Sequence, residues 1–69
     1  MLRIEMTDAI THEKTWAWSN KSYKNVSEFV SEYNDQAQKF GIETITEQKS
    51  RILSLGACIV VHLWVFKVV

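Results

Sequence analysis

The chain has 69 residues, of which 46% are hydrophobic, and its eight basic and eight acidic side chains give a net charge of zero. This length predicts a single small domain over residues 1–69, and the neutral charge removes the electrostatic basis for binding nucleic acid or an anionic membrane. One cysteine excludes an internal disulfide, which fits a reducing cytoplasmic compartment. No Cys/His cluster has metal-ligand spacing, so we expect no metal and no cofactor. A domain this small usually needs further support, and we expect oligomerisation to supply it.

The first two predicted elements are strands that form a hairpin. Leu2, Ile4 and Met6 alternate with polar side chains, which is the pattern of a half-buried strand. Residues 14–19 alternate again and place Trp16 and Trp18 on one face. The polar residues 8–13 would connect the two strands.

A helix is predicted over residues 26–40. Asn25 can cap its start, with Glu28 three positions later, and Gly41 can supply the left-handed residue that ends it. Apolar residues spaced three and four apart define one stripe of an amphipathic helix. That stripe consists of Val26, Phe29, Val30, Tyr33, Ala37 and Phe40.

Two further strands are predicted after the helix. Residues 42–48 are strand-like, and the chain must then reverse between Lys49 and Gly56. The last thirteen residues, 57–69, are mostly β-branched or aromatic and predict one long strand, residues 57–67, with two apolar faces. One face would carry Cys58, Val60, His62, Trp64, Phe66 and Val68, and the other Ile59, Val61, Leu63, Val65, Lys67 and Val69. Because a sheet open to water normally has one polar face, the second apolar face needs cover from another copy or a partner protein.

A membrane anchor is the alternative interpretation of the C-terminal run. Residues 52–69 approach the minimum of about 17 residues for a spanning helix. The run contains Ser54, Gly56, His62 and Lys67, and its β-branched side chains favour a strand. We therefore expect no membrane association.

The order strand, strand, helix, strand, strand predicts an α+β fold. An antiparallel sheet of about four strands (ββαββ) would carry one amphipathic helix on one face. The opposite face would be left uncovered, with some of Trp16, Trp18, Trp64 and Phe66 on it.

No residue pattern indicates catalysis. His12 and His62 lie fifty positions apart without an acidic partner at fixed spacing, and an apolar strand position favours an interior or interface role for His62. No Gly-x-Ser-x-Gly elbow is present, and two glycines cannot build the usual phosphate loop. We expect no enzymatic activity.

Two groups of side chains are candidates for binding. The first is aromatic, since Trp and Tyr are favoured where binding energy concentrates, although the same rings can simply fill a small core. The second is basic and lies near the helix start and the third predicted strand. Cations beside a tyrosine suit the phosphate and base of a nucleotide. Alternatively, these side chains form an ordinary solvent-exposed rim. The candidate site residues are Trp16, Trp18, Tyr23, Lys24, Arg51, His62, Trp64 and Phe66.

In size and layout the chain resembles very small accessory proteins encoded by bacteriophages and prophages. The similarity consists of a bare α+β domain, few glycines, near-neutral charge and a surplus hydrophobic strand. Residues 16–69 are also loosely similar to small sporulation-associated proteins of bacilli. These resemblances imply proteins that bind a host factor or sequester a small signalling molecule, often as oligomers.

The sequence therefore supports two hypotheses for function. The leading one is a non-enzymatic intracellular protein, a homo-oligomer and most simply a dimer, that inhibits or modulates a host protein as a phage counter-defence factor. The alternative is an oligomeric protein that sequesters a nucleotide-like signal between its subunits, with Trp18 or Tyr23 on the base and Lys24 or Arg51 on phosphate.

Overall fold

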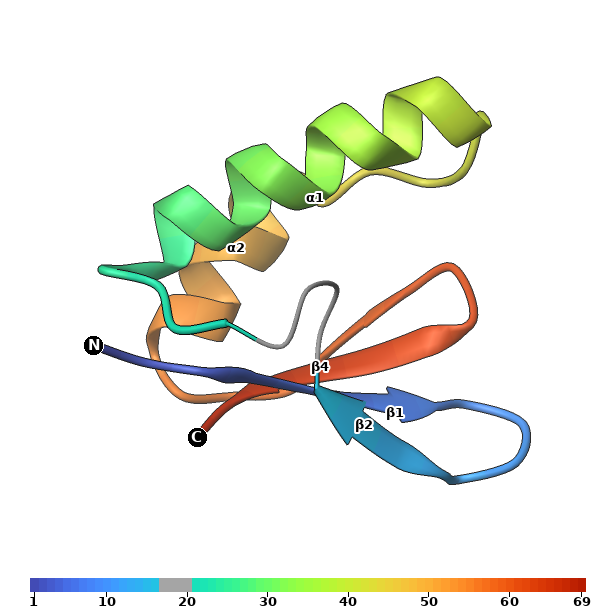
Figure 1. Cartoon of the computed structure of the whole chain (residues 1–69), viewed down its shortest axis with the longest axis horizontal. Helices are drawn as coiled ribbons and strands as arrows, with labels where there is room; N and C mark the ends of the chain where they lie inside the picture. Colours follow the sequence, from blue (N-terminus) through green and yellow to red (C-terminus); the bar gives the residue numbers. More distant parts are fainter. Residues whose placement is uncertain (17–20) are drawn as a thin grey trace.

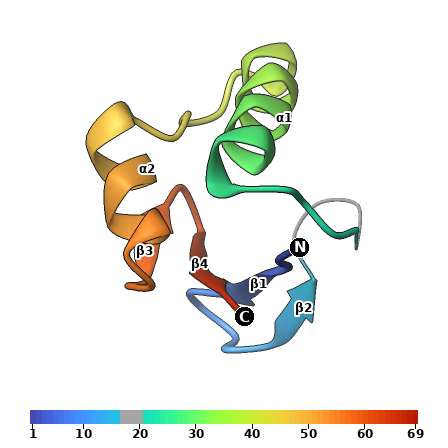
Figure 2. The ribbon, with the colours of Figure 1, turned by 90° about the vertical axis from the view of Figure 1, so that its left-hand side faces the viewer.

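The computed structural model describes residues 1–16 and 21–69 and contains a four-stranded antiparallel sheet and two helices. The elements in chain order are β1 (Ile4–Asp8), β2 (Lys14–Trp16), α1 (Val26–Phe40), α2 (Glu47–Ser54), β3 (Ile59–Val61) and β4 (Trp64–Val68). The strand order is β2-β1-β4-β3, so the first and last strands of the chain pair at the centre of the sheet. Both helices lie on the same side of the sheet (Figures 1 and 2).

The α+β class and an antiparallel sheet of four strands are confirmed. The prediction of a single helix is wrong, and so are the positions predicted for the third and fourth strands. The additional helix, α2, begins at Glu47, inside the segment that was predicted to be the third strand. Thr46 caps it by accepting a hydrogen bond from the backbone N–H of Lys49 at 3.2 Å. Leu53 anchors α2 because its side chain is fully buried in the core.

The core lies between the helices and the sheet and is largely aromatic. The ring of Phe29 on α1 lies 5.5 Å from that of Phe66 on β4 and 5.4 Å from that of Tyr23, both edge to face. Tyr33 lies 5.4 Å from Phe66 in the same arrangement. Such geometry adds roughly 0.5–1.5 kcal/mol per pair to the burial of the rings. All four rings are completely removed from solvent.

Both predicted caps of α1 are present. The side chain of Asn25 accepts a hydrogen bond from the N–H of Glu28 at 2.9 Å, and Gly41 adopts a left-handed φ of 67°. The predicted apolar stripe is buried, with Val30 half-buried, except at its end, where Phe40 is 70% exposed. Phe40 is the last residue of α1, so no further turn holds its ring against the sheet.

Residues 42–46 have no regular secondary structure and bond to side chains instead of a neighbouring strand. The carboxamide of Asn34 donates to the carbonyl of Ile45 at 3.1 Å and accepts from its N–H at 2.7 Å. The hydroxyl of Tyr33 donates to the carbonyl of Glu43 at 2.8 Å. Side chains of α1 thus satisfy the backbone that a strand partner would have satisfied.

The predicted single C-terminal strand is a hairpin. β3 and β4 pair with Val61 opposite Trp64, so His62 and Leu63 form the turn. His62 has a φ of 55°, a left-handed conformation that is uncommon for a residue other than glycine. The turn also corrects the predicted faces, because it aligns Ile59 with Phe66 on the core side and places Val60 opposite Val65 on the other.

A candidate protein-binding surface

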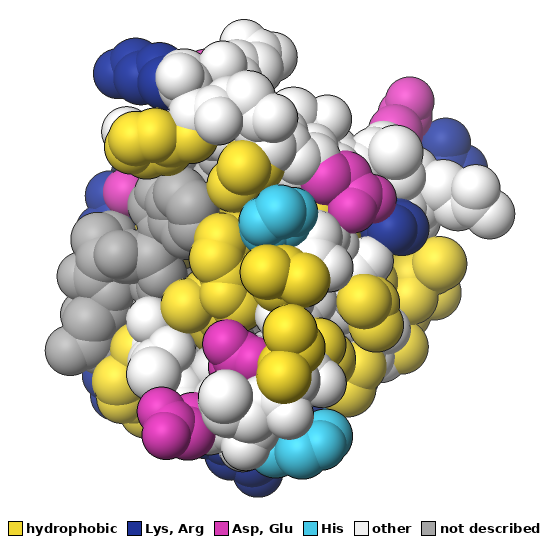
Figure 3. Space-filling view, turned by 90° about the vertical axis from the view of Figure 1, so that its right-hand side faces the viewer, with side chains coloured by type: hydrophobic (Ala, Val, Ile, Leu, Met, Phe, Trp, Pro, Cys, Tyr) yellow, Lys and Arg dark blue, Asp and Glu magenta, His cyan; other side chains and the backbone are white. Residues whose placement is uncertain are grey.

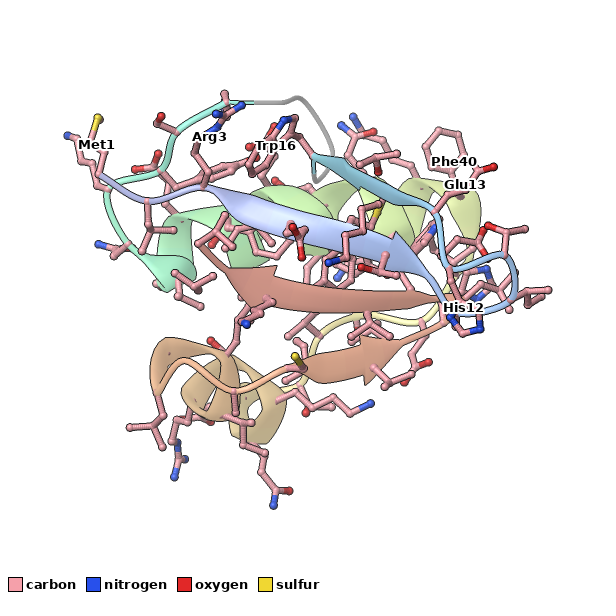
Figure 4. All side chains as sticks on the ribbon, turned by 90° about the horizontal axis from the view of Figure 1, so that it is seen from below. Met1, Arg3, His12, Glu13, Trp16 and Phe40 are labelled. Carbon is pink, nitrogen blue, oxygen red and sulfur yellow. The ribbon has the colours of Figure 1, made fainter. Side chains whose placement is uncertain are left out.

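One face of the sheet is turned away from both helices, and we call it the open face. Its residues follow from the register, because neighbours across the strands share a face and side chains alternate along each strand. Figure 4 looks onto this face from below the sheet. The open face carries Arg3, Glu5, Thr7, Lys14, Trp16, Val60, Val65 and Lys67.

The charged half of the open face is organised around Glu5. Glu5 lies opposite Trp16 in β2 and opposite Lys67 in β4, and its carboxylate lies 4.0 Å from the ammonium of Lys14. The guanidinium of Arg3 covers the ring of Trp16 at 3.7 Å from its centroid, and the two side chains lie side by side in Figure 4. Three cations therefore share this face with one carboxylate.

The apolar half of the open face continues to the tips of the two hairpins. Val60 and Val65 face each other across β3 and β4, and Val60 is 56% exposed. The N–H of Ala9, in the β1–β2 turn, donates to the carbonyl of Leu63 at 2.8 Å and so joins the two tips. Ile10 and Leu63 are also exposed there. Figure 3 shows hydrophobic side chains gathered at this end of the molecule, between two histidines.

Both hairpin tips hold a histidine in the left-handed region, His12 with φ 64° and His62 with φ 55°. The β1–β2 turn is held by Asp8, whose carboxylate accepts hydrogen bonds from the N–H groups of Ile10 at 2.8 Å and Thr11 at 2.9 Å. These bonds stabilise the charged form and lower the pKa of Asp8, with the Thr11 bond as the largest cause. Asp8 thus keeps the tip in a defined shape.

The outer edge of β3 is occupied by an ion pair that we call the edge clasp, Glu43 and Lys49. The carboxylate of Glu43 accepts a hydrogen bond from the N–H of His62 at 2.7 Å, and the ammonium of Lys49 donates to the carbonyl of Val60 at 2.7 Å. The two charged groups lie 3.3 Å apart. The bond from His62, and then that from Lys49, lower the pKa of Glu43. Two backbone groups of this edge are therefore already bonded.

The aromatic candidates predicted from the sequence divide between the open face and the core. Trp16 lies on the open face and is 40% exposed, whereas Trp18 lies outside the described residues. Tyr23 and Phe66 are completely buried and present no surface to a ligand. Trp64 is half-buried on the core side. Neither Trp64 nor Phe66 belongs to the uncovered face, which corrects that expectation, because the turn at residues 62–63 reverses the chain and the paired register carries both rings to the core side.

The remaining candidates do not form a nucleotide site with Tyr23. Lys24 and Arg51 are exposed, and Arg51 pairs with Glu47 one helical turn away in α2 at 3.2 Å. His62 is exposed, and its ring contacts Trp64 edge to face at 5.3 Å. Because the ring of Tyr23 is part of the core, it cannot stack on a base beside these groups.

Sequence reasoning named only Trp16 among the eight residues of the open face and missed the other seven, including Arg3, Glu5, Val60 and Lys67. The alternation of residues 2–7 already separated Arg3 and Glu5 from the buried side of β1. Val60 and Lys67 depended on the turn at residues 62–63, which contains none of the residues that usually mark a two-residue hairpin.

Within residues 1–16 and 21–69 there is no pocket and no cluster of three or more His, Cys, Asp or Glu side chains able to hold a metal ion. Neither of the helices described has both the length and the apolar character needed to cross a bilayer. Comparisons of the chain with protein-family models, curated proteins and solved structures find no match.

Proposed function

We propose that this chain is a non-enzymatic binding protein whose open face docks onto a host protein and inhibits or modulates it. The observation that carries the proposal is the combination, on the uncovered side of the sheet, of exposed Trp16 and Val60 with several charged side chains. Tryptophan and arginine are enriched among the residues that dominate binding energy at protein interfaces. The resemblance to small phage accessory proteins supports a bacterial host and a role in counter-defence.

The arrangement of the open face suits a protein partner. Large exposed apolar side chains that adjoin one another, with charges at their rim, are typical of protein-binding surfaces. Val60, Leu63 and Ile10 supply exposed apolar side chains, and the charged group around Glu5 lies beside them on the same sheet. Flat surfaces of this kind bind proteins more readily than small molecules, which need concave sites.

Sequestration of a nucleotide gains no support from a specific observation. The tyrosine assigned to base stacking is in the core, and the described surface has no pocket. Trp18, the other residue expected to stack on a base, lies outside the described residues.

The proposal can be tested with the single cysteine of the chain, Cys58, which is exposed directly before β3. A benzophenone attached to Cys58 should crosslink a defined protein from a bacterial lysate at one-to-one stoichiometry when illuminated. Excess unlabelled protein should suppress the product, and Trp16→Ala in the labelled protein should reduce it several-fold. Purified partner activity should then fall when the unlabelled chain is added.

The matched control moves the label to the helical side of the molecule. Cys58→Ser combined with Ser31→Cys places the same probe on the exposed surface of α1. Equal crosslinking from both positions, or a product insensitive to Trp16→Ala, would contradict docking through the open face. A partner whose activity is unchanged by the chain would contradict an inhibitory or modulating role.

A further inference from the structure

We infer that the partner presents an acidic surface to the open face, with carboxylates beside an apolar side chain. This inference rests on the proposed function and specifies the chemistry of its partner. It follows from the charges of Arg3, Lys14 and Lys67 around Glu5 and from the valine pair beside them.

The open face is positive although the chain as a whole is neutral. Arg3, Lys14 and Lys67 against Glu5 give this face a net charge of +2, and the remaining surface carries the compensating −2. Lys67 has no ion-pair partner among the described residues, and Lys14 reaches Glu5 only at 4.0 Å. The charges of these two lysines are therefore only partly neutralised within the described residues, and acidic groups of a partner can pair with them.

The positions of the charged and apolar side chains on the open face also predict where the partner's groups would lie. Carboxylates would meet Lys67 and Lys14, which lie on opposite sides of β1, and an apolar side chain would lie on Val65 and Val60. Glu5, half-buried between the two lysines, can accept a hydrogen bond from a backbone N–H or a hydroxyl of the partner. This combination is a property of an acidic protein segment.

A nucleic acid fits the open face less well than an acidic protein does. Single-stranded nucleic acids bind sheets by stacking bases on exposed rings, and one side of the Trp16 ring is already covered by Arg3. Trp64 and Phe66 point to the core side, so they add no second stacking position. A phosphate chain that crossed β1 would also meet the carboxylate of Glu5.

The same charges disfavour binding of a second copy of the chain to the open face. In a two-fold dimer formed by this face, identical surfaces meet, so a net charge of +2 would face a net charge of +2. Each copy offers a single carboxylate, Glu5, which already has Lys14 nearby. An acidic partner removes this repulsion and a second copy adds to it.

The inference can be tested by nuclear magnetic resonance on isotope-labelled full chain at low salt. The probes are a twelve-residue peptide that alternates Glu with Val, its counterpart with Lys in place of Glu, and a twelve-residue oligothymidylate. The acidic peptide should shift the amide signals of β1 and β4 and leave those of the exposed side of α1 unchanged. Raising the salt concentration should weaken this binding.

Two charge reversals of equal size provide the matched comparison. Lys67→Glu should weaken binding of the acidic peptide by about tenfold, since it replaces an attraction with a repulsion at short range. Lys39→Glu makes the same change at the exposed end of α1 and should alter binding less than about twofold at this distance from the open face. Unchanged circular dichroism would show that both variants are folded.

The inference is overturned if the acidic peptide fails to bind at millimolar concentration, or if the basic peptide or the oligothymidylate binds more tightly. It is also overturned if dilution of the protein alone moves the β1 and β4 signals, because a second copy would then occupy the face. These outcomes are separable from failure of the proposed function. If a partner crosslinked through Cys58 binds the Lys67→Glu variant equally well, the proposed function stands, but the inference that the partner is acidic is wrong.

Discussion

Replacing Asn34 with alanine tests the contact that holds residues 42–46 against α1. The Asn34 carboxamide makes two hydrogen bonds, to the N–H of Ile45 at 2.7 Å and to its carbonyl at 3.1 Å. Ile45 itself is only 4% exposed, so water cannot fully replace the lost partner. We expect Asn34→Ala to lower the free energy of unfolding and to free this segment.

The magnitude follows from three terms. Two hydrogen bonds contribute about 1 kcal/mol each, and leaving buried backbone groups unsatisfied adds roughly 1 kcal/mol more. Alanine is the better helix former by about 0.6 kcal/mol, which offsets part of the loss. The net decrease should be about 2 kcal/mol, which in a chain of this size lowers the melting temperature by roughly 8–16 °C.

Urea denaturation measures this change, and amide hydrogen exchange at Ile45 reports the contact directly. Gln38→Ala is the matched control, because it removes an exposed carboxamide from the same helix and should change stability by less than about 0.5 kcal/mol. If Asn34→Ala costs less than about 0.5 kcal/mol and the Ile45 amide stays protected, residues 42–46 are held by something other than Asn34. Pairing with a strand, as the sequence predicted, would give that result.

Gly41→Ala should lower the free energy of unfolding by about 1 kcal/mol in urea, because φ is 67° while a Cβ would meet nothing within 4 Å; no change would contradict the left-handed cap. Leu53→Ala should cost about 2–5 kcal/mol, since this side chain is fully buried, and a cost below about 1 kcal/mol would mean that α2 is not docked. Stability should fall with acid as Glu43 protonates. The hydrogen bond from the His62 N–H and the pairing with Lys49 hold its pKa below 4.5, so its contribution is complete above 4.5 and lost as the pH falls through the lowered value. Glu43→Gln should flatten this part of an acid titration followed by circular dichroism, and coinciding curves would show that the pair adds no stability.

The elements that the sequence predicted well carry local signals. α1 has a capping Asn25, a terminal Gly41 and apolar residues at helical spacing, and each of these acts within a few residues. The pairing of β1 with β2 likewise follows from short alternating runs on either side of a polar turn.

The errors arise where tertiary contacts override local preference. Residues 42–46 contain β-favouring Ile and Thr, yet Asn34 satisfies Ile45 from another element, and Thr46 starts a helix. The capping threonine was the available signal for α2. No residue in the sequence marks the turn at His62. Its φ of 55° is uncommon for histidine and is held by the strand pairs on either side of the turn.

For the candidate binding surface, the sequence predicted that one side of the sheet would lack cover and that Trp16 could lie there. It could not identify the charged group, because the pairing of Glu5 with Lys67 joins residues from opposite ends of the chain. A register error of one residue exchanges every side chain between the two faces. The register of β3 and β4 depends on the turn at residues 62–63, which no sequence signal marks.

The edge clasp has a consequence for solubility. The last thirteen residues combine high β-propensity with little charge, which is the composition that templates fibrils when an unpaired strand edge is available. Glu43 and Lys49 occupy two backbone groups of that edge, so an incoming chain must displace a charged pair before it can add a strand. We expect Lys49→Met to shorten the lag time of fibril formation measured by thioflavin fluorescence, even where the folded state remains stable. Two side chains from outside the sheet would thus keep strands of further chains from pairing with the edge of β3.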